Sequence, residues 1–290
     1  MKISEKLKDG KTHISIEVFP PKTDAKYPTV IQAVDEMARL NPSYMSVTYG
    51  AGGGTSENTV RIASHIKHDL GMESLAHLTC VSSTKAMVKK VIRGLKDAGI
   101  ENVLALRGDI PEDSSVEIAR DYRYASELIR EIRESGDFCI GAACYPEGHV
   151  ESQDRRDDIR RLKEKVECGV DFLTTQMFFD NSLYYSFLYR IREQGITIPV
   201  IPGIMPVTNA AQMERICKMS GSFLPERFLS MLDRFGSYPA AMKQAGIAYA
   251  TEQIVSLIAN GIQNIHIYSM NKPEVAEAIM NNLSEMIEHE

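Results

Sequence analysis

The sequence has no CxxC pair, no long apolar run and no leader-like beginning. Its five cysteines are an odd number and are scattered, so neither a disulfide framework nor a metal centre of the zinc type is indicated. No segment approaches the roughly 20 apolar residues that cross a bilayer, and the polar start MKISEKLKDGK lacks the apolar core of a signal peptide. We therefore expect a soluble, cytoplasmic protein without a membrane partner.

An excess of positive charge is also missing. Lys and Arg number 33 against 39 Asp and Glu, which gives a net charge of −6 and a pI near 5.7. Because a phosphate backbone selects for a basic protein surface, we expect no nucleic-acid partner.

What the sequence does contain is a repeated alternation. A short run rich in Val, Ile, Leu and Tyr ends in polar or glycine residues, and a longer amphipathic segment follows. Eight such short runs are expected to be strands, at residues 13–19, 44–50, 74–80, 102–109, 139–146, 171–178, 199–206 and 264–270.

This alternation predicts an α/β fold, a (β/α)8 TIM barrel with extra helices in the stretch from about 222 to 262, before the last strand. The composition shows no break, so residues 1–290 are expected to form one domain. A doubly wound open sheet is the alternative, but no GxGxxG follows the first strand.

Alternate residues of a barrel strand point inward, and the apolar set Ile14, Ile16 and Val18 suits the outer, helix-facing side of the first strand. The inward residues are then largely polar. They are Ser15, Glu17, Phe19, Ser46, Thr48, His77, Thr79, Arg107, Asp109, Thr174, Gln176, His266 and Tyr268. Buried polar groups near the C-terminal ends of several strands indicate an active site at the mouth of the barrel.

Seven segments carry a specific resemblance. They are EVFPPK (17–22), SVTYGAGG (46–53), HLTC (77–80) with ALRGD (105–109), AACYPEGH (142–149), TTQMFFD (174–180) and IPGIMPVTN (201–209). In this order they resemble bacterial, single-domain methylenetetrahydrofolate reductase, over residues 13 to 272.

The resemblance implies an FAD-dependent oxidoreductase of one-carbon metabolism and methionine biosynthesis, acting on a CH–NH group. Such an enzyme reduces 5,10-methylenetetrahydrofolate to 5-methyltetrahydrofolate in a ping-pong reaction with NADH or NADPH, and the residues do not decide between the two donors. The resemblance also implies a homo-oligomer and no C-terminal regulatory domain.

Glu17 is the candidate general acid. Ring opening of the folate needs a proton on the departing nitrogen, and burial between Ile16 and Val18 favours a carboxyl group that stays protonated. The residues alone leave an ion pair with an inward arginine equally open. The resemblance implies catalysis.

Asp109 is the second candidate catalytic residue. The resemblance places it between flavin and folate, where a carboxylate would favour hydride donation and the cationic iminium form of the folate. Without the resemblance, an aspartate that caps the following loop or helix would explain the position.

The resemblance places further residues around FAD. Near the flavin they are Thr48, Tyr49, Ala51, His77, Arg107, Gly108 and Asp109, and near the adenosine they are Tyr124 and Ala125. Asp158, Arg161 and Lys165 share one helix face and could meet the ribose and pyrophosphate together with Tyr145 and His149. A solvated, salt-bridged helix explains the same charges. Two positions depart from the family pattern, which has Asn at Arg161 and a basic residue at Glu164.

For the folate, the resemblance implies Gln176 and Gln212, whose amides can pair both edges of a pterin, and Lys272, which could reach the glutamate tail. Glu17 and Asp109 would also contact it. Ile216 departs from the family pattern, which has a stacking Phe there. Two other functions remain open: another FAD-linked barrel dehydrogenase, of the proline-oxidising type, or a flavin- or folate-binding subunit that needs a partner reductase.

Overall fold

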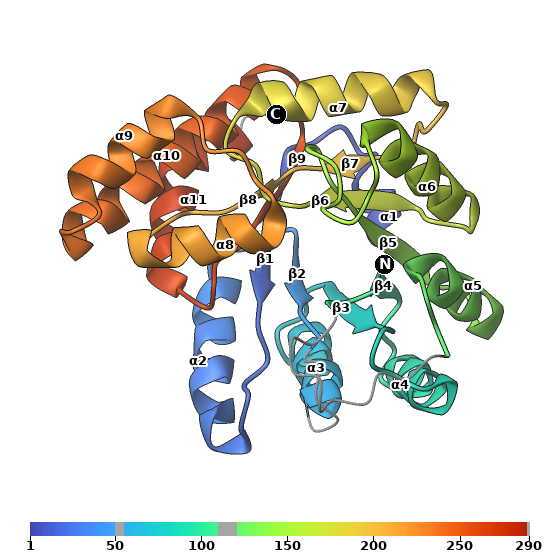
Figure 1. Cartoon of the computed structure of the whole chain (residues 1–290). Coiled ribbons are helices and arrows are strands. Elements are labelled where there is room, and N and C mark those ends of the chain that lie inside the picture. The colour runs from blue at the N-terminus through green and yellow to red at the C-terminus, as the bar shows by residue number, and fades with distance from the viewer. Residues whose placement is uncertain (50–54, 110–120, 289–290) are drawn as a thin grey trace.

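A computed structural model describes residues 1–49, 55–109 and 121–288. The described residues include one parallel sheet whose strands run side by side in the order β7-β6-β5-β4-β3-β2-β1-β9-β8 (Figure 1). The strands are β1 (His13–Val18), β2 (Tyr44–Val47), β3 (Ser74–Thr79), β4 (Asn102–Leu106), β5 (Cys139–Cys144), β6 (Phe172–Thr175), β7 (Val200–Ile201), β8 (Gly203–Ile204) and β9 (Asn264–Ile267).

The two ends of this sheet are halves of one predicted strand, divided at Pro202. Val200 pairs with Leu173 of β6, whereas Gly203 pairs with His266 of β9. Proline has no N–H for the ladder, but its carbonyl oxygen accepts a hydrogen bond of 2.9 Å from the N–H of His266. The sheet therefore returns on itself as a TIM-barrel-like fold, which confirms the predicted fold class. All eight predicted strands are present, the seventh as two segments.

Helices lie outside the strands (Figure 1). Those of the βα units are α2 (Tyr27–Ala38), α3 (Thr55–Ser64), α4 (Lys85–Asp97), α5 (Ala125–Ser135), α6 (Arg155–Glu167), α7 (Asn181–Glu193) and α11 (Pro273–Glu288). The predicted extra helices before the last strand are α8 (Met213–Ser220), α9 (Glu226–Phe235) and α10 (Pro239–Ala259). Short turns complete the elements: α1 (Ile3–Lys6), η1 (Asp24–Lys26), the π-helical η2 (His65–Asp69) and η3 (Ala210–Gln212).

Polar caps set where several of these helices begin. The side chains of Thr84, Asp154 and Asp180 accept backbone N–H groups in the first turns of α4, α6 and α7. An N-cap oxygen satisfies an N–H that the helix leaves without a partner. Each cap fixes the length of the loop that connects a strand to its helix, and these loops form the mouth of the barrel.

Two apolar layers hold the barrel. Ile14, Ile16 and Val18 belong to the main core between strands and helices, as the strand parity predicts. A second cluster, which includes Ile3 of α1, Leu104 and Phe172, fills one end of the barrel interior. The polar residues are thereby left at the other end. Among the described residues, no helix is long and apolar enough to cross a membrane.

Helix α10 reaches the barrel through a glycine. A Cβ on Gly246 would lie 1.8 Å from the carbonyl oxygen of Val207, so the helix backbone packs directly on the segment after β8. Gly94 of α4 has no atom within 4 Å of the equivalent position. The two helical glycines therefore differ in what a methyl group would meet.

We expect Gly246→Ala to lower the free energy of unfolding by about 2–3 kcal/mol, because the added methyl group forces α10 away from Val207. Gly94→Ala is the matched control and should stabilise the protein by about 0.5–1 kcal/mol through the helix preference of alanine. Urea unfolding of both variants measures the difference. Equal stability of the two variants would contradict the close packing.

Candidate active site

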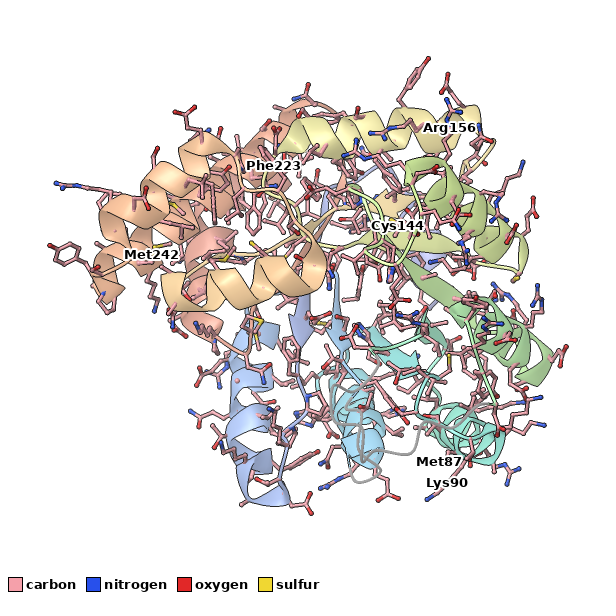
Figure 2. All side chains as sticks on the ribbon, viewed as in Figure 1. Met87, Lys90, Cys144, Arg156, Phe223 and Met242 are labelled. Carbon is pink, nitrogen blue, oxygen red and sulfur yellow. The ribbon has the colours of Figure 1, made fainter. Side chains whose placement is uncertain are left out.

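One cavity of about 740 Å³ opens at the C-terminal ends of the strands. It brings together the predicted residues Glu17, Thr48, Tyr49, His77, Arg107, Gly108, Asp109, Tyr124, Ala125, Tyr145, His149, Asp158, Arg161, Lys165 and Gln176. Cys144, at the end of β5, also lines it and lies in the interior of the molecule, whereas Lys90 points away from α4 (Figure 2). Glu17 and Asp109 thus share a single cavity.

Glu17 lies on β1, is only 6% exposed and is flanked by two histidines. Its Oε2 is 3.6 Å from the Nε2 of His77 on β3 and 3.6 Å from the Nε2 of His266 on β9. Among the described residues, no Lys or Arg lies within ion-pair distance of Glu17. No described arginine therefore forms the alternative ion pair with Glu17, and strand parity brings histidines to this carboxyl instead.

His77 is a buried, neutral imidazole. Burial lowers its pKa to about 4, although the nearby Glu17 acts in the opposite direction. Its Nε2 and the Oγ1 of Thr174 are buried in the cavity wall without a hydrogen-bond partner among the described residues. Leaving such a group unpaired costs about 1–3 kcal/mol, so a bound molecule that hydrogen-bonds here is favoured.

At the rim, β4 leads into a tight turn at Gly108. Its φ of +86° is unfavourable for other residues, and a Cβ would lie 3.0 Å from the Cβ of Thr79. Next to it, Arg107 donates two hydrogen bonds of 2.6 and 2.7 Å to Glu151. This pairing raises the pKa of Arg107 and lowers that of Glu151. The turn at Gly108 and the ion pair between Arg107 and Glu151 together fix the rim of the cavity beside Asp109.

Helix α6 has two different faces. Arg160 and Arg161 pair with Asp157, as in the salt-bridged helix that was the alternative interpretation, although Arg161 also lines the rim of the cavity. On the inner face, Asp158 and Lys165 line the cavity. Burial lowers the pKa of Lys165, whose Nζ donates to the carbonyl oxygen of Ala143. Among the described residues, no carboxylate lies within ion-pair distance of this ammonium group, which suits an anionic ligand.

Aromatic rings complete the wall. Tyr145 meets His149 edge-on, with ring centroids 4.7 Å apart, and burial raises the pKa of Tyr145 to about 12. Tyr268 donates a hydrogen bond of 2.6 Å to the carbonyl oxygen of Thr175. These hydroxyls stay protonated at neutral pH and act as hydrogen-bonding groups rather than as bases.

The comparisons with known proteins agree with one another. The sequence model of the family "Methylenetetrahydrofolate reductase" matches residues 2–284. The chain belongs to the methylenetetrahydrofolate reductase family. It is 34% identical to 5,10-methylenetetrahydrofolate reductase of Escherichia coli K12, over 94% of this chain and 91% of that protein. Its identity to the enzyme of Pectobacterium carotovorum is 32%, with the same coverage.

A plant reductase and two solved structures extend the comparison. Methylenetetrahydrofolate reductase (NADH) 1 of Zea mays is 34% identical over 97% of this chain, which spans 50% of that protein. A Clostridium thermocellum protein described as binding two copies of 5-methyl-5,6,7,8-tetrahydrofolic acid has a TM-score of 0.65 at 16% identity and covers 97% of this chain and 98% of its own. Dihydropteroate synthase of Xanthomonas albilineans has a TM-score of 0.54 at 11% identity, with coverages of 95% and 93%. These two likenesses concern the fold.

Three residues expected from the reductase resemblance are not placed in the cavity. Ala51 and the side chain of Gln212 lie outside the described residues. Lys272 is not part of the cavity wall, and its Nζ donates a hydrogen bond of 2.6 Å to the Oγ1 of Thr208.

Other wall residues were not singled out by the sequence. Glu151, Met177, Met205 and Met270 line the cavity from loops and strand ends. Glu151 could be found only from its pairing with Arg107, since no local pattern marks it. The inward position of His266 was expected from strand parity, but no role was assigned to it.

The neutral state of His77 predicts a pH-dependent stability. The unfolded chain takes up a proton near the ordinary histidine pKa, while the folded barrel resists it down to about 4. The free energy of unfolding should therefore fall as the pH is lowered from about 6.5 toward 4. Between pH 7 and 5, His77→Gln should lose less stability than the parent protein, by an amount on the order of 1 kcal/mol, in urea unfolding. Identical losses would contradict the buried neutral histidine.

Proposed function

We propose that this protein reduces 5,10-methylenetetrahydrofolate to 5-methyltetrahydrofolate, with NADH or NADPH as donor and FAD as cofactor. The observation that carries the proposal is the carboxyl of Glu17, buried in the wall of the cavity with no lysine or arginine of the described residues paired to it. A buried carboxyl group that faces the cavity can pass a proton to a folate bound there, which is the task of a general acid. Membership of the reductase family supports the choice of substrate.

The cavity has features that fit FAD. Gly108 lets a flat ring approach the backbone, and the unpaired Nε2 of His77 and Oγ1 of Thr174 offer hydrogen bonds. Lys165 would hold the pyrophosphate, with Asp158 on the ribose, while Tyr124 and Ala125 would border the adenosine. When bound, FAD supplies the two-electron carrier between nicotinamide and folate. Because both substrates would use the same cavity, the reaction would be ping-pong.

We expect Lys165→Met to weaken FAD binding by about tenfold to a hundredfold, because a charge-assisted contact to phosphate contributes about 1.5–3 kcal/mol. Lys163→Met, on the exposed side of the same helix, is the matched control and should bind FAD as the parent protein does. Quenching of flavin fluorescence on titration into the apoprotein gives both dissociation constants. Equal affinities for the two variants would rule out the role given to Lys165.

The proposed mechanism gives each polar residue one task. Glu17 donates a proton to the departing ring nitrogen of the folate, which opens the five-membered ring to an iminium ion. The carboxylate of Asp109 stabilises that positive charge at the rim. Gln176 pairs with the pterin through its amide, and the apolar floor around Leu104 excludes water from the hydride acceptor.

Replacing Glu17 separates the two half-reactions. Glu17→Gln should accept electrons from the nicotinamide at nearly the parental rate but pass them to methylenetetrahydrofolate about 10²- to 10⁴-fold more slowly, because the amide cannot donate the required proton. Anaerobic stopped-flow absorbance of the flavin follows each half-reaction. A normal folate half-reaction in this variant would show that another group is the acid.

The same experiment on the unmodified protein tests the proposal itself. NADH and NADPH are compared as flavin reductants, which identifies the donor. Bleaching of the flavin by either nicotinamide, with no other protein present, would exclude a binding subunit that depends on another reductase. Reoxidation of the flavin by methylenetetrahydrofolate, but not by other acceptors, would exclude a different dehydrogenase. We further propose that residues 1–290 act as one catalytic domain in a cytoplasmic homo-oligomer.

A further inference from the structure

Three methionines line one sector of the cavity, and the proposed mechanism gives none of them a task. Met177 follows β6, Met205 follows β8 and Met270 follows β9. The segments β7 and β8, which are halves of one predicted strand, lie between β6 and β9. Because the C-terminal ends of neighbouring parallel strands meet at one edge, the three side chains share one side of the mouth. We call these three residues the thioether wall.

A hydrogen bond shows how close the two outer strands of this sector are. The hydroxyl of Tyr268, which follows β9, donates to the carbonyl oxygen of Thr175 at the end of β6 over 2.6 Å. The tyrosine ring passes Gly203 of β8, where a Cβ would lie only 2.5 Å from it. The ends of β6 and β9 are therefore one side chain apart, and the thioether wall occupies a small part of the mouth.

Met270 is held at the rim by its backbone. It is 40% exposed, and both Met270 and Asn271 have left-handed φ angles, of +55° and +54°. The side chain of Asn271 fixes this turn, because its Oδ1 accepts from the N–H of Phe19 over 2.7 Å and its Nδ2 donates to the carbonyl oxygen of Phe19 over 2.9 Å. Residues other than glycine rarely adopt this conformation, and it persists only where the surroundings impose it. The turn thus keeps a thioether at the cavity, open to small solutes.

The other sulfur of the described cavity wall is less reactive. Burial raises the pKa of the Cys144 thiol, and its Sγ donates to the carbonyl oxygen of Thr174 over 3.7 Å. A thiol that stays protonated reacts poorly with oxidants, because the thiolate is the nucleophile. The sulfur of a thioether carries its lone pairs at every pH. The methionines are therefore the sulfur groups of this cavity that are ready for oxidation.

We propose that the thioether wall is a site of reversible oxidation by hydrogen peroxide, which closes the cavity to the aromatic ring of a substrate. The sulfur lone pair attacks one peroxide oxygen, the O–O bond breaks, and the other oxygen keeps its proton, takes the second one and leaves as water. The sulfur loses two electrons and the peroxide gains them. The resulting sulfoxide is polar and no longer packs on an apolar ring as a thioether does.

The source of the peroxide rests on the proposed function. When no folate is present, a reduced flavin passes two electrons and two protons to dioxygen, which becomes hydrogen peroxide in the same cavity. Oxidation of the thioether wall then stops the protein from consuming nicotinamide when no folate is there to receive the hydride. A methionine sulfoxide reductase returns the sulfoxides to thioethers, so the block is reversible.

The position of the sulfoxides is the first test. The flavin-loaded protein is kept with NADH or NADPH in air without folate, while catalase in the solution destroys the peroxide that leaves the cavity. Peptide mass spectrometry measures the sulfoxide at each methionine. Met87 on α4 (Figure 2) and Met286 on α11 are the matched controls, because they are 40% and 39% exposed but lie outside the cavity wall.

We expect about fivefold to tenfold more sulfoxide on the thioether wall than at either control, since oxidation follows access to the oxidant. Equal sulfoxide at Met270 and Met87 would place the oxidation in bulk solution and would overturn the inference.

The effect of the sulfoxides on binding is the second test. In the oxidised protein, nicotinamide should bind about threefold to tenfold more weakly, because contacts between sulfur and an aromatic ring are lost. The dependence of anaerobic flavin reduction on nicotinamide concentration gives this affinity, and methionine sulfoxide reductase should restore it. Unchanged affinity in the oxidised protein would contradict the inference.

A triple variant is the control for damage elsewhere. Met177→Leu, Met205→Leu and Met270→Leu together keep the side-chain volume but remove the sulfur. This variant should bind nicotinamide equally well before and after the treatment. An equal loss of affinity in the triple variant and the parent protein would show that other residues carry the effect.

A third measurement separates the inference from the proposed function. If nicotinamide failed to bleach the flavin, the proposed function would be wrong, and the thioether wall would be tested in the flavin-free protein with added hydrogen peroxide. Folic acid is then the probe. It should slow sulfoxide formation at Met270 about fivefold and leave Met87 unchanged, because only Met270 lines the cavity. The same rate at Met270 with and without folic acid would overturn the inference.

Discussion

Desolvation inside a closed parallel sheet is the constraint on which the rest of the structure depends. Strand alternation sends every second side chain into a small interior, and most of that space is filled by apolar groups such as Leu104 and Phe172. At the mouth, the same geometry buries Glu17, His77 and His266 together. Polar groups removed from water must find partners or change their protonation state. Here burial lowers the pKa of His77, so that a neutral imidazole lies beside the buried carboxyl group of Glu17.

The charged groups of the site are separated by depth. Deep in the cavity, no Lys or Arg in the described part of the chain lies within ion-pair distance of Glu17, while at the rim Arg107 and Glu151 neutralise each other in a two-bond pair. On α6 the cation Lys165 has no carboxylate partner among the described residues. An elongated ligand with an uncharged ring at one end and phosphates farther along matches this order. The buried carboxyl group and the ammonium group are therefore kept apart within one cavity.

Much of this architecture could be predicted from periodicity, because the period of two along a strand is a local property. It located the eight strands, and it placed Glu17, His77 and His266 inside the barrel. The resemblance to the reductase family supplied roles for Arg107 and Asp109, and helical spacing placed Lys165 on one face with Asp158. The sequence could not show that Pro202 divides a strand. Whether a proline interrupts the pairing depends on which neighbouring strands offer N–H groups on either side of it. Nor could it pair Arg107 with Glu151, or direct Lys272 to Thr208, because those contacts join distant loops.

The pairing of β1 with β9 has a consequence for how the protein is made. Residues 13–16 lie beside residues 264–267, so the first strand has to wait for the last. A chain emerging from the ribosome cannot complete the ring until almost all of it has been synthesised. The same late event brings His266 to Ser15 and Glu17. The surroundings of Glu17 are therefore completed only in the final stage of assembly, and chains truncated before β9 lack this corner of the cavity.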